Sequence, residues 1–183
     1  MRLSTRARYT LRVMIALARM SGHEQPVSLA KLADRTQIPY RYLEKLVTAL
    51  KKASLVHPVQ GRAGGYLLAL PAGEVRIGQI IEAGIGPINI VKCVKRPESC
   101  LKSDCCECRY LYMQINNRIL QVLNEYSLAD IADPKWRERI SSELALDEMH
   151  AVRTSAQTTR PAVWPRGRRD ARKQSHSIRR GRR

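Results

Sequence analysis

Residues 28–70 read SLAKLADRTQIPYRYLEKLVTALKKASLVHPVQGRAGGYLLAL. Ser28 is a good helix cap, and the apolar spacing after it predicts a short helix that ends near Arg35. A turn over residues 36–38 leads to a second helix, for which Pro39 suits the first position because its missing N–H would be unpaired there. The second helix has one apolar face, made of Leu43, Leu46, Val47 and Leu50. Two short helices joined by a tight turn indicate a helix-turn-helix.

A β-hairpin is expected directly after these helices. Residues 55–59 and 66–70 have the composition of short strands, and the stretch between them is Gln-Gly-Arg-Ala-Gly-Gly. Glycine at the tip allows the backbone to approach a phosphate or a groove closely, and Arg62 adds a charge. A hairpin that follows a helix-turn-helix is typical of the wing of a winged helix. The sequence therefore favours a DNA-binding winged helix over a small helical bundle with a solvated basic face.

Further helices are expected on both sides of this region. One covers residues 5–21 with Thr5 as its cap, and another covers residues 75–83 until Gly84, Gly86 and Pro87 break it. A longer helix over residues 109–126 carries apolar residues at alternating steps of three and four, which makes it a candidate dimer interface. They are Leu111, Ile115, Ile119, Val122 and Tyr126. Pro134 starts a last helix that runs to about residue 149.

The expected fold class is mainly α with a small β wing, namely a winged helix-turn-helix plus a long dimerisation helix. Residues 1–84 form the winged helix-turn-helix DNA-binding domain, and residues 85–108 form a cysteine loop that binds a cluster. Residues 109–150 contain the dimerisation helix and the C-terminal helix. Residues 151–183 form a disordered basic tail.

The charge balance points to a polyanionic partner. The 183 residues carry 33 Lys and Arg against 16 acids, a net charge of +17. Residues 151–183 hold 11 of these bases and one acid, so residues 1–150 keep 22 bases and 15 acids and are basic themselves. Nucleic acid is the expected partner. No stretch of about 18 apolar residues occurs, so neither a signal peptide nor a membrane span is expected, and the expected location is the cytoplasm.

Five cysteines lie within sixteen residues, at positions 93, 100, 105, 106 and 108. Their number is odd and four of them are too close together for independent disulfides. In a reducing compartment, clustered thiols indicate metal or redox chemistry. Lys and Arg residues nearby favour the thiolate form, which is the form that metals bind. Cys93-x6-Cys100-x5-Cys106 supplies three thiolates that could hold an iron-sulfur cluster.

Residues 1–132 resemble the Rrf-two family of winged-helix transcription regulators, in particular its IscR, NsrR and RirA types. Four stretches carry the resemblance: MRLSTRARY at the start, YLEKL at 42–46, GRAGGYLL at 61–68, and the cysteine loop. The resemblance implies a homodimer in which the cluster loop lies beside the other subunit. It also implies that Cys93, Cys100 and Cys106 are the three cluster ligands.

The fourth ligand stays open. Arg109 stands where IscR-type members have a histidine ligand, and Arg8 stands where NsrR-like members have a carboxylate. Cys108 and Cys105 are the nearest substitutes, and a small-molecule ligand is an alternative. The sequence does not separate a two-iron from a four-iron cluster.

The second helix and the wing supply most of the expected DNA contacts. Arg6 and Arg8, near the start of the chain, are expected to add contacts to the DNA backbone. The candidate DNA-binding residues are Arg2, Ser28, Pro39, Tyr40, Arg41, Tyr42, Glu44, Lys45, Gly61, Arg62, Gly64 and Gly65. Four thiolates would also suit zinc, so a zinc-stapled regulator is one alternative. A cluster-free regulator and a basic RNA-binding protein are others. An enzyme is not expected, because the four histidines are scattered without a Ser or Asp partner.

Overall fold

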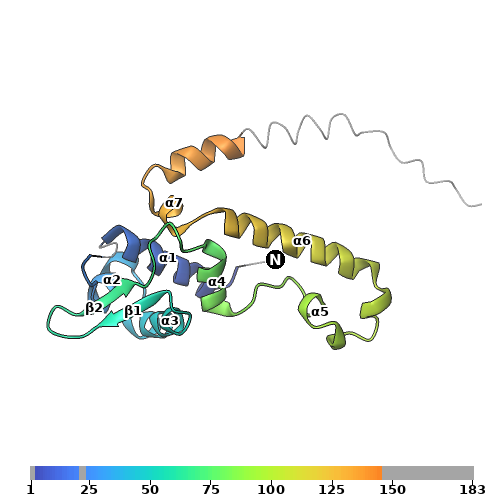
Figure 1. Ribbon diagram of the computed structural model, residues 1–183, viewed down its shortest axis with the longest axis horizontal. Coiled ribbons are helices and arrows are strands. Elements are labelled where there is room, and N and C mark those ends of the chain that lie inside the picture. The colour runs from blue at the N-terminus through green and yellow to red at the C-terminus, as the bar shows by residue number, and fades with distance from the viewer. Residues whose placement is uncertain (1–2, 21–23, 146–183) are drawn as a thin grey trace, which may run out of the picture. The chain divides into compact units, whose positions relative to one another are not determined.

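The computed structural model describes residues 3–20 and 24–145. Arg2, the end of the expected last helix and the expected basic tail lie outside the described residues. The elements, in chain order, are α1 (Thr5–Met20), α2 (Leu29–Thr36), α3 (Tyr40–Lys52), β1 (Val56–Val59), β2 (Gly65–Leu68), α4 (Ile77–Ile85), α5 (Lys92–Lys95), the 3-10 turns η1 (Pro97–Ser99) and η2 (Ser103–Cys105), α6 (Glu107–Glu125) and α7 (Leu128–Ala132) (Figure 1). Residues 136–145 are also helical.

The helix-turn-helix is set by local capping. The Ser28 hydroxyl accepts a hydrogen bond from the Lys31 N–H at 3.3 Å and so caps α2, as predicted. Gln37 ends α2 in the left-handed conformation, with φ of 56°, and its N–H donates to the Ala33 carbonyl. Pro39 is the cap residue of α3 rather than its first helical residue, because its carbonyl accepts the first helical bond, from Leu43 N–H.

The wing is an antiparallel pair in which Val56 lies opposite Leu68 and Val59 lies opposite Gly65. The residue before α2, Val27, extends this pair. Its N–H and C=O bond to the Tyr66 C=O and N–H at 3.0 and 2.9 Å. A Cβ on Gly65 would collide with the Val27 carbonyl oxygen, so glycine is required where the wing meets this bridge.

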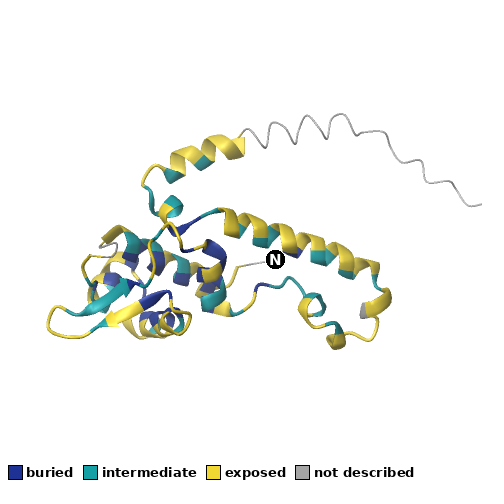
Figure 2. Ribbon diagram, in the orientation of Figure 1, coloured by how far each residue is buried: buried dark blue, intermediate teal, exposed yellow. Residues whose placement is uncertain are grey.

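One apolar core joins these elements (Figure 2). All four apolar residues predicted on α3 are buried, and α4 buries Ile77, Ile80 and Ile81 as expected. The prediction that Gly84 breaks this helix is wrong, because α4 continues to Ile85. A Cβ on Gly84 would lie 2.6 Å from Thr10 Oγ1 of α1, so this glycine permits close packing of α1 against α4. Gly86, with φ of 81°, ends the helix.

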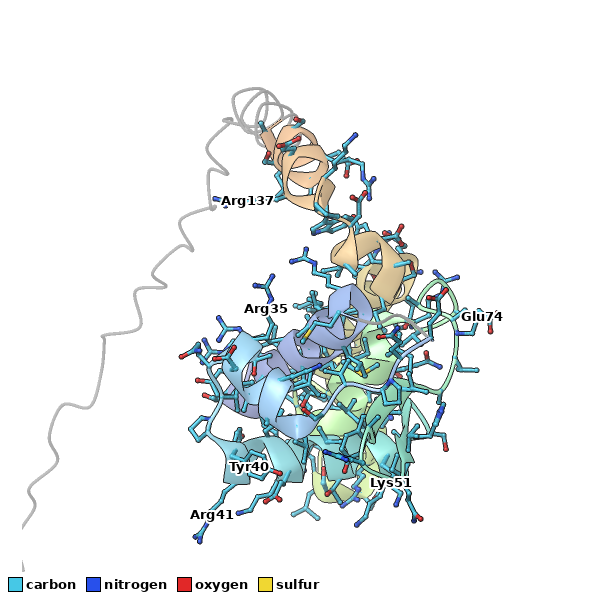
Figure 3. The ribbon with its side chains drawn as sticks, turned by 90° about the vertical axis from the view of Figure 1, so that its left-hand side faces the viewer. Arg35, Tyr40, Arg41, Lys51, Glu74 and Arg137 are labelled. Atoms are coloured by element: carbon cyan, nitrogen blue, oxygen red, sulfur yellow. The ribbon has the colours of Figure 1, made fainter. Side chains whose placement is uncertain are left out.

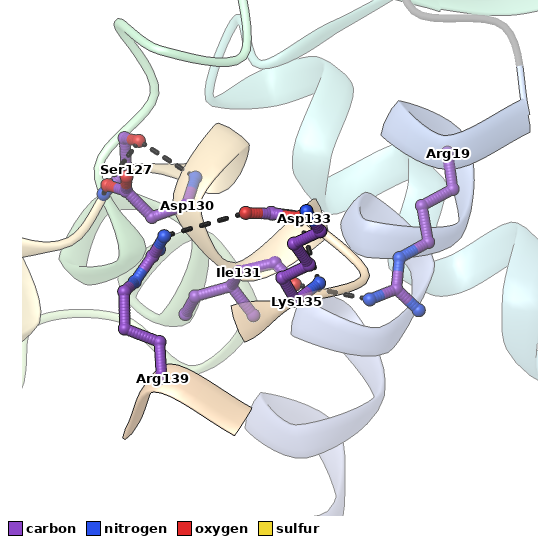
Figure 4. A network of polar contacts seen from close by, with 7 residues as sticks. All are labelled: Arg19, Ser127, Asp130, Ile131, Asp133, Lys135 and Arg139. Carbon is purple, nitrogen blue, oxygen red and sulfur yellow. Dashed lines mark hydrogen bonds and ion pairs between the residues drawn. The ribbon is translucent and has the colours of Figure 1, made fainter. Parts of the chain in front are cut away.

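Hydrogen bonds from Arg19 hold the helix α7 against α1 (Figure 4). Arg19 donates from Nε to the Ala132 carbonyl at 2.8 Å and from its NH2 group to the Ile131 carbonyl. Ser127 caps α7, and the Asp130 carboxylate accepts hydrogen bonds from the Ser127 hydroxyl and N–H. These two bonds lower the pKa of Asp130 below its ordinary value.

Two smaller expectations need correction. The residue that caps α1 is Ser4, whose hydroxyl accepts from the Ala7 N–H at 3.2 Å, whereas Thr5 is already helical. The cysteine stretch is not an open loop, since α5, η1 and η2 fill much of it with short helical turns. Of the helices described, none has an apolar stretch long enough to cross a membrane.

Candidate functional site

The outward face of α3 is polar and exposed, whereas its inward face is part of the core. Tyr40 is 49% exposed, and Arg41, Glu44 and Lys45 are exposed as well. Figure 3 shows Tyr40 and Arg41 projecting outward from the first turn of α3. The first turns of this helix therefore present a phenol, two cations and a carboxylate to an outside partner.

Tyr42 has a different position on α3. Its ring is half-buried and meets the ring of Tyr9 edge-on, with centroids 5.9 Å apart. This contact fixes α3 against α1. Arg12 adds a second connection to the helix-turn-helix, because it donates to the Thr36 carbonyl at the end of α2.

A shallow pocket of about 570 Å³ opens beside this face. Arg6 of α1 lines it together with Arg41, Glu44, Lys45 and Thr48. The structure thus brings Arg6 next to the outward face of α3. Thr48 also lines this pocket, although the sequence did not suggest it as a site residue. Its place one helical turn after Glu44 was the available signal. Its hydroxyl donates to the Glu44 carbonyl at 2.7 Å.

The wing tip is a tight turn with an exposed arginine. Gly64 N–H donates to the Gly61 carbonyl at 2.9 Å, and Gly61 has φ of 112°, a region that favours glycine. A Cβ on Gly64 would collide with the carbonyl oxygen of Val59. Arg62 is exposed between these two glycines, so the tip carries its charge toward solvent.

The five cysteines are free thiols in the stretch that runs from α5 to the first turn of α6. Cys93 lies in α5 and Cys106 is the cap residue of α6, and both are half-buried. Cys100, which ends η1, is exposed, as are Cys105 and Cys108. Across the described ranges, no three Cys, His, Asp or Glu side chains gather closely enough to hold a metal ion.

Arg109 connects two of these cysteines to α6. Its side-chain Nε donates to the Cys93 carbonyl at 2.9 Å, and its backbone N–H donates to the Cys106 carbonyl at 3.0 Å. A guanidinium has no lone pair to give to a metal, so Arg109 acts as a brace and not as a ligand. The sequence identified Arg109 as a departure from the histidine of related proteins but not this contact.

Asn116 makes a second connection between α6 and the chain before the cysteines. Its side chain is buried, with 3% exposed, and Oδ1 accepts a hydrogen bond from the Ile90 N–H at 3.2 Å. With the Arg109 contact, it ties α6 to both ends of residues 90–93.

The donor chemistry of this segment suits iron or zinc, because cysteine sulfur is a ligand that both metals accept. The arrangement of the thiols does not yet form a site. Binding of such a group by Cys93, Cys100 and Cys106 would require these three side chains to come closer together than they lie in this structure.

Much of the helix α6 is exposed (Figure 2), and one side of it is apolar. Leu111, Ile115 and Val122 are 59%, 41% and 51% exposed. Together with Ile119 and Leu123, they line a groove of about 500 Å³. Isolated apolar residues on a surface are ordinary, whereas a continuous exposed stripe is typical of interaction surfaces.

Comparison with known proteins identifies the fold and the family. The sequence profile of the family described as "Rrf2: Iron-dependent Transcriptional regulator" matches residues 3–134. The chain is 36% identical to the HTH-type transcriptional regulator IscR of Pectobacterium atrosepticum over 135 residues, which are 74% of this chain and 81% of that protein. It is 34% identical to protein rrf2 of Nitratidesulfovibrio vulgaris over 131 residues, covering 72% and 87% of the two chains.

Solved structures agree with this assignment. CymR, the global cysteine regulator of B. subtilis, matches with a TM-score of 0.59 and 33% identity, over 72% of this chain and 96% of that one. T. potens IscR matches with a TM-score of 0.58 and 30% identity, over 72% and 85% of the two chains. The predicted winged helix-turn-helix fold is confirmed, and the relatives are transcription regulators rather than enzymes, as expected. The chain therefore belongs to the Rrf2 family of DNA-binding transcription regulators.

Proposed function

We propose that this regulator binds a double-stranded DNA operator as a homodimer, and that an iron-sulfur cluster held by Cys93, Cys100 and Cys106 controls the binding. The observation that carries the sensing part is the gathering of five free thiols within sixteen residues, beside the helix α6. The reducing cytoplasm is the compartment in which these thiols would persist.

The DNA-binding part rests on the outward face of α3. In this proposal α3 enters the major groove, where Tyr40, Arg41, Glu44 and Lys45 meet base edges or phosphates. A carboxylate in a basic interface is unfavourable unless it accepts from a cytosine amino group or orients a neighbour, so Glu44 has the largest effect on sequence preference. Arg62 at the wing tip and Arg6 of α1 bind phosphates.

Two substitutions test these roles. Glu44→Ala changes the preferred sequence in a binding selection, whereas Glu74→Ala, an exposed acid after the wing, leaves it unchanged. Arg62→Ala lowers the slope of log affinity against log salt by about one unit, and Arg137→Ala serves as its control. Unchanged preference in Glu44→Ala would remove Glu44 from base reading. An unlabelled RNA competitor that displaces the operator equally well would favour the RNA-binding alternative.

The homodimer part rests on the exposed apolar stripe of α6. A second copy of α6 covers the groove lined by Ile115 and Ile119, because a twofold axis brings the same stripe from both subunits together. Ile115→Asp with Ile119→Asp places two carboxylates in that contact and yields monomers in analytical ultracentrifugation. Asn117→Asp with Gln121→Asp, which are exposed positions on α6 outside that groove, makes the same charge change and leaves the dimer intact.

The cluster part is tested by its ligands. A bound cluster would supply a redox-active and oxygen-sensitive group that iron limitation or nitric oxide dismantles. Anaerobic reconstitution with iron and sulfide is expected to load the wild type, whereas Cys93→Ala, Cys100→Ala and Cys106→Ala each lose iron and acid-labile sulfide. Cys105→Ala and Cys108→Ala test the two candidates for the fourth ligand.

Metal analysis separates this proposal from its alternatives. Zinc bound without sulfide in the wild type would establish the zinc-stapled regulator. A protein that holds neither metal after reconstitution would be the cluster-free regulator. An intact cluster in Cys93→Ala would refute the proposed ligand set.

A further inference from the structure

A pocket of about 610 Å³ lies at the edge of the cysteine segment, apart from the α3 face and from the α6 groove. Pro87 and Ile90 form its apolar part. Its polar part comes from the stretch between α4 and η2, and its volume lies within the range of small-molecule sites, roughly 300–1,000 Å³. The DNA-binding surface proposed above shares none of its lining residues.

Three cationic side chains line this pocket: Lys92 and Lys95 of α5 and Arg96 directly after it. All three are exposed, so each can turn its charged group toward a bound molecule. None of the lining residues is acidic, although Glu98 lies only two residues after Arg96. Three cations in one concave site, without a carboxylate among them, favour an anionic ligand.

Asn89, which also lines the pocket, adds a second requirement. Its Nδ2 donates to the Pro87 carbonyl at 3.2 Å, whereas its Oδ1 is shielded from solvent and accepts no hydrogen bond within the described part of the chain. A buried acceptor without a donor is unfavourable. If the amide turns into the pocket and gives up the Pro87 contact, a ligand O–H group can donate to this oxygen.

We propose that this pocket binds a small hydroxy acid with two or more carboxylates. The carboxylates pair with Lys92, Lys95 and Arg96, and the hydroxyl donates to Asn89 Oδ1. A neutral hydroxyl meets no repulsion from the three cations, unlike the ammonium of an amino acid, and therefore suits the acceptor better. The inference goes beyond the proposed function, because it needs neither DNA nor a cluster.

The test compares two probes that differ by one hydroxyl. L-malate and succinate have the same two carboxylates and the same carbon chain, but only malate has the hydroxyl. Isothermal titration of the full chain at low salt is expected to show saturable malate binding, with succinate weaker by about fivefold. Low salt is needed because screening weakens exposed ion pairs.

Three variants assign the binding to this pocket. Lys92→Gln with Lys95→Gln weakens both acids by at least about tenfold, because two charge-assisted contacts are lost. Asn89→Leu removes the difference between malate and succinate. Lys51→Gln with Lys52→Gln makes the same charge change at the end of α3 and leaves the affinity of both acids as in the wild type.

Several results would overturn the inference. No saturable malate binding to the wild type would remove the site, and equal binding of malate and succinate would remove the hydroxy-acid class. Inorganic phosphate that binds as tightly as malate would show a general anion site instead. If the Lys51→Gln and Lys52→Gln substitutions weakened the binding of both acids as much as those at Lys92 and Lys95, the loss of affinity would come from the change in net charge and not from this pocket. Because no DNA or cluster enters this measurement, its failure leaves the proposed function intact.

Discussion

The contact between Gly84 of α4 and Thr10 of α1 gives a sharp prediction about stability. Thr10 is fully buried, and its hydroxyl is held by donation to the Arg6 carbonyl at 2.8 Å. A Cβ at position 84 would lie 2.6 Å from this hydroxyl oxygen and 3.2 Å from Thr10 Cβ. Neither atom is the end of a flexible side chain, so the new methyl group must push the two helices apart.

The expected magnitude is the difference between two effects. Alanine in place of glycine inside a helix stabilises by about 0.5–1 kcal/mol, whereas overpacking a close contact costs about 1–3 kcal/mol. Because Thr10 is fixed, we expect the upper part of that cost, and Gly84→Ala should destabilise the protein by about 1–2 kcal/mol. With Thr10→Ala the closest atom becomes a Cβ at 3.2 Å, so the same substitution in that background should be neutral or stabilising.

Urea unfolding of the four proteins of this double-mutant cycle, followed by circular dichroism at one protein concentration, measures the coupling. The predicted interaction energy is about 2 kcal/mol. Gly73→Ala is the matched control, since a Cβ there meets nothing within 4 Å, and its free energy of unfolding should change by less than about 1 kcal/mol. Additivity of Gly84→Ala and Thr10→Ala within about 0.5 kcal/mol would refute the steric explanation.

Two further predictions concern single polar groups. Asn116→Ala leaves the Ile90 N–H without its acceptor and should lower the free energy of unfolding by about 1–3 kcal/mol, whereas Asn117→Ala, its exposed neighbour, should change it by less than about 0.5 kcal/mol. The pKa of Asp130 is lowered by hydrogen bonds from Ser127, so its stabilisation is present above the ordinary value of 3.8 and is lost as the pH falls through the lower folded value. The difference in unfolding free energy between wild type and Asp130→Asn should therefore shrink in acid, and a constant difference across the pH series would contradict this origin.

The sequence was informative where structure depends on neighbours along the chain. Ser28 caps α2 and the apolar residues of α3 face the core because capping and helical periodicity are local properties. Gly84 shows the limit of that reasoning. A glycine near the end of an apolar helix resembles a breaker, and only the packing of α1 against α4 reveals that the helix continues through it.

The same limit applies to the cysteine segment. The sequence predicts thiols as the metal donors, because residue type decides which metals a site suits. It could not show that the Arg109 side chain reaches the Cys93 carbonyl sixteen residues earlier, since this contact depends on how α5 lies beside α6. The distances between the three proposed ligands likewise depend on the fold of the segment, and the spacing along the chain does not determine them.

The bridge between Val27 and Tyr66 has a consequence for how the wing would meet DNA in the complex proposed above. Two backbone hydrogen bonds hold the base of the hairpin to the residue that precedes the Ser28 cap. The base and the helix-turn-helix therefore approach a duplex with their relative position already fixed. Residues 60–64 lie between the two paired strands, and fixing the backbone of one residue costs about 1–2 kcal/mol in conformational entropy. In the proposed complex, the conformational entropy that the wing would lose is therefore that of a short tip.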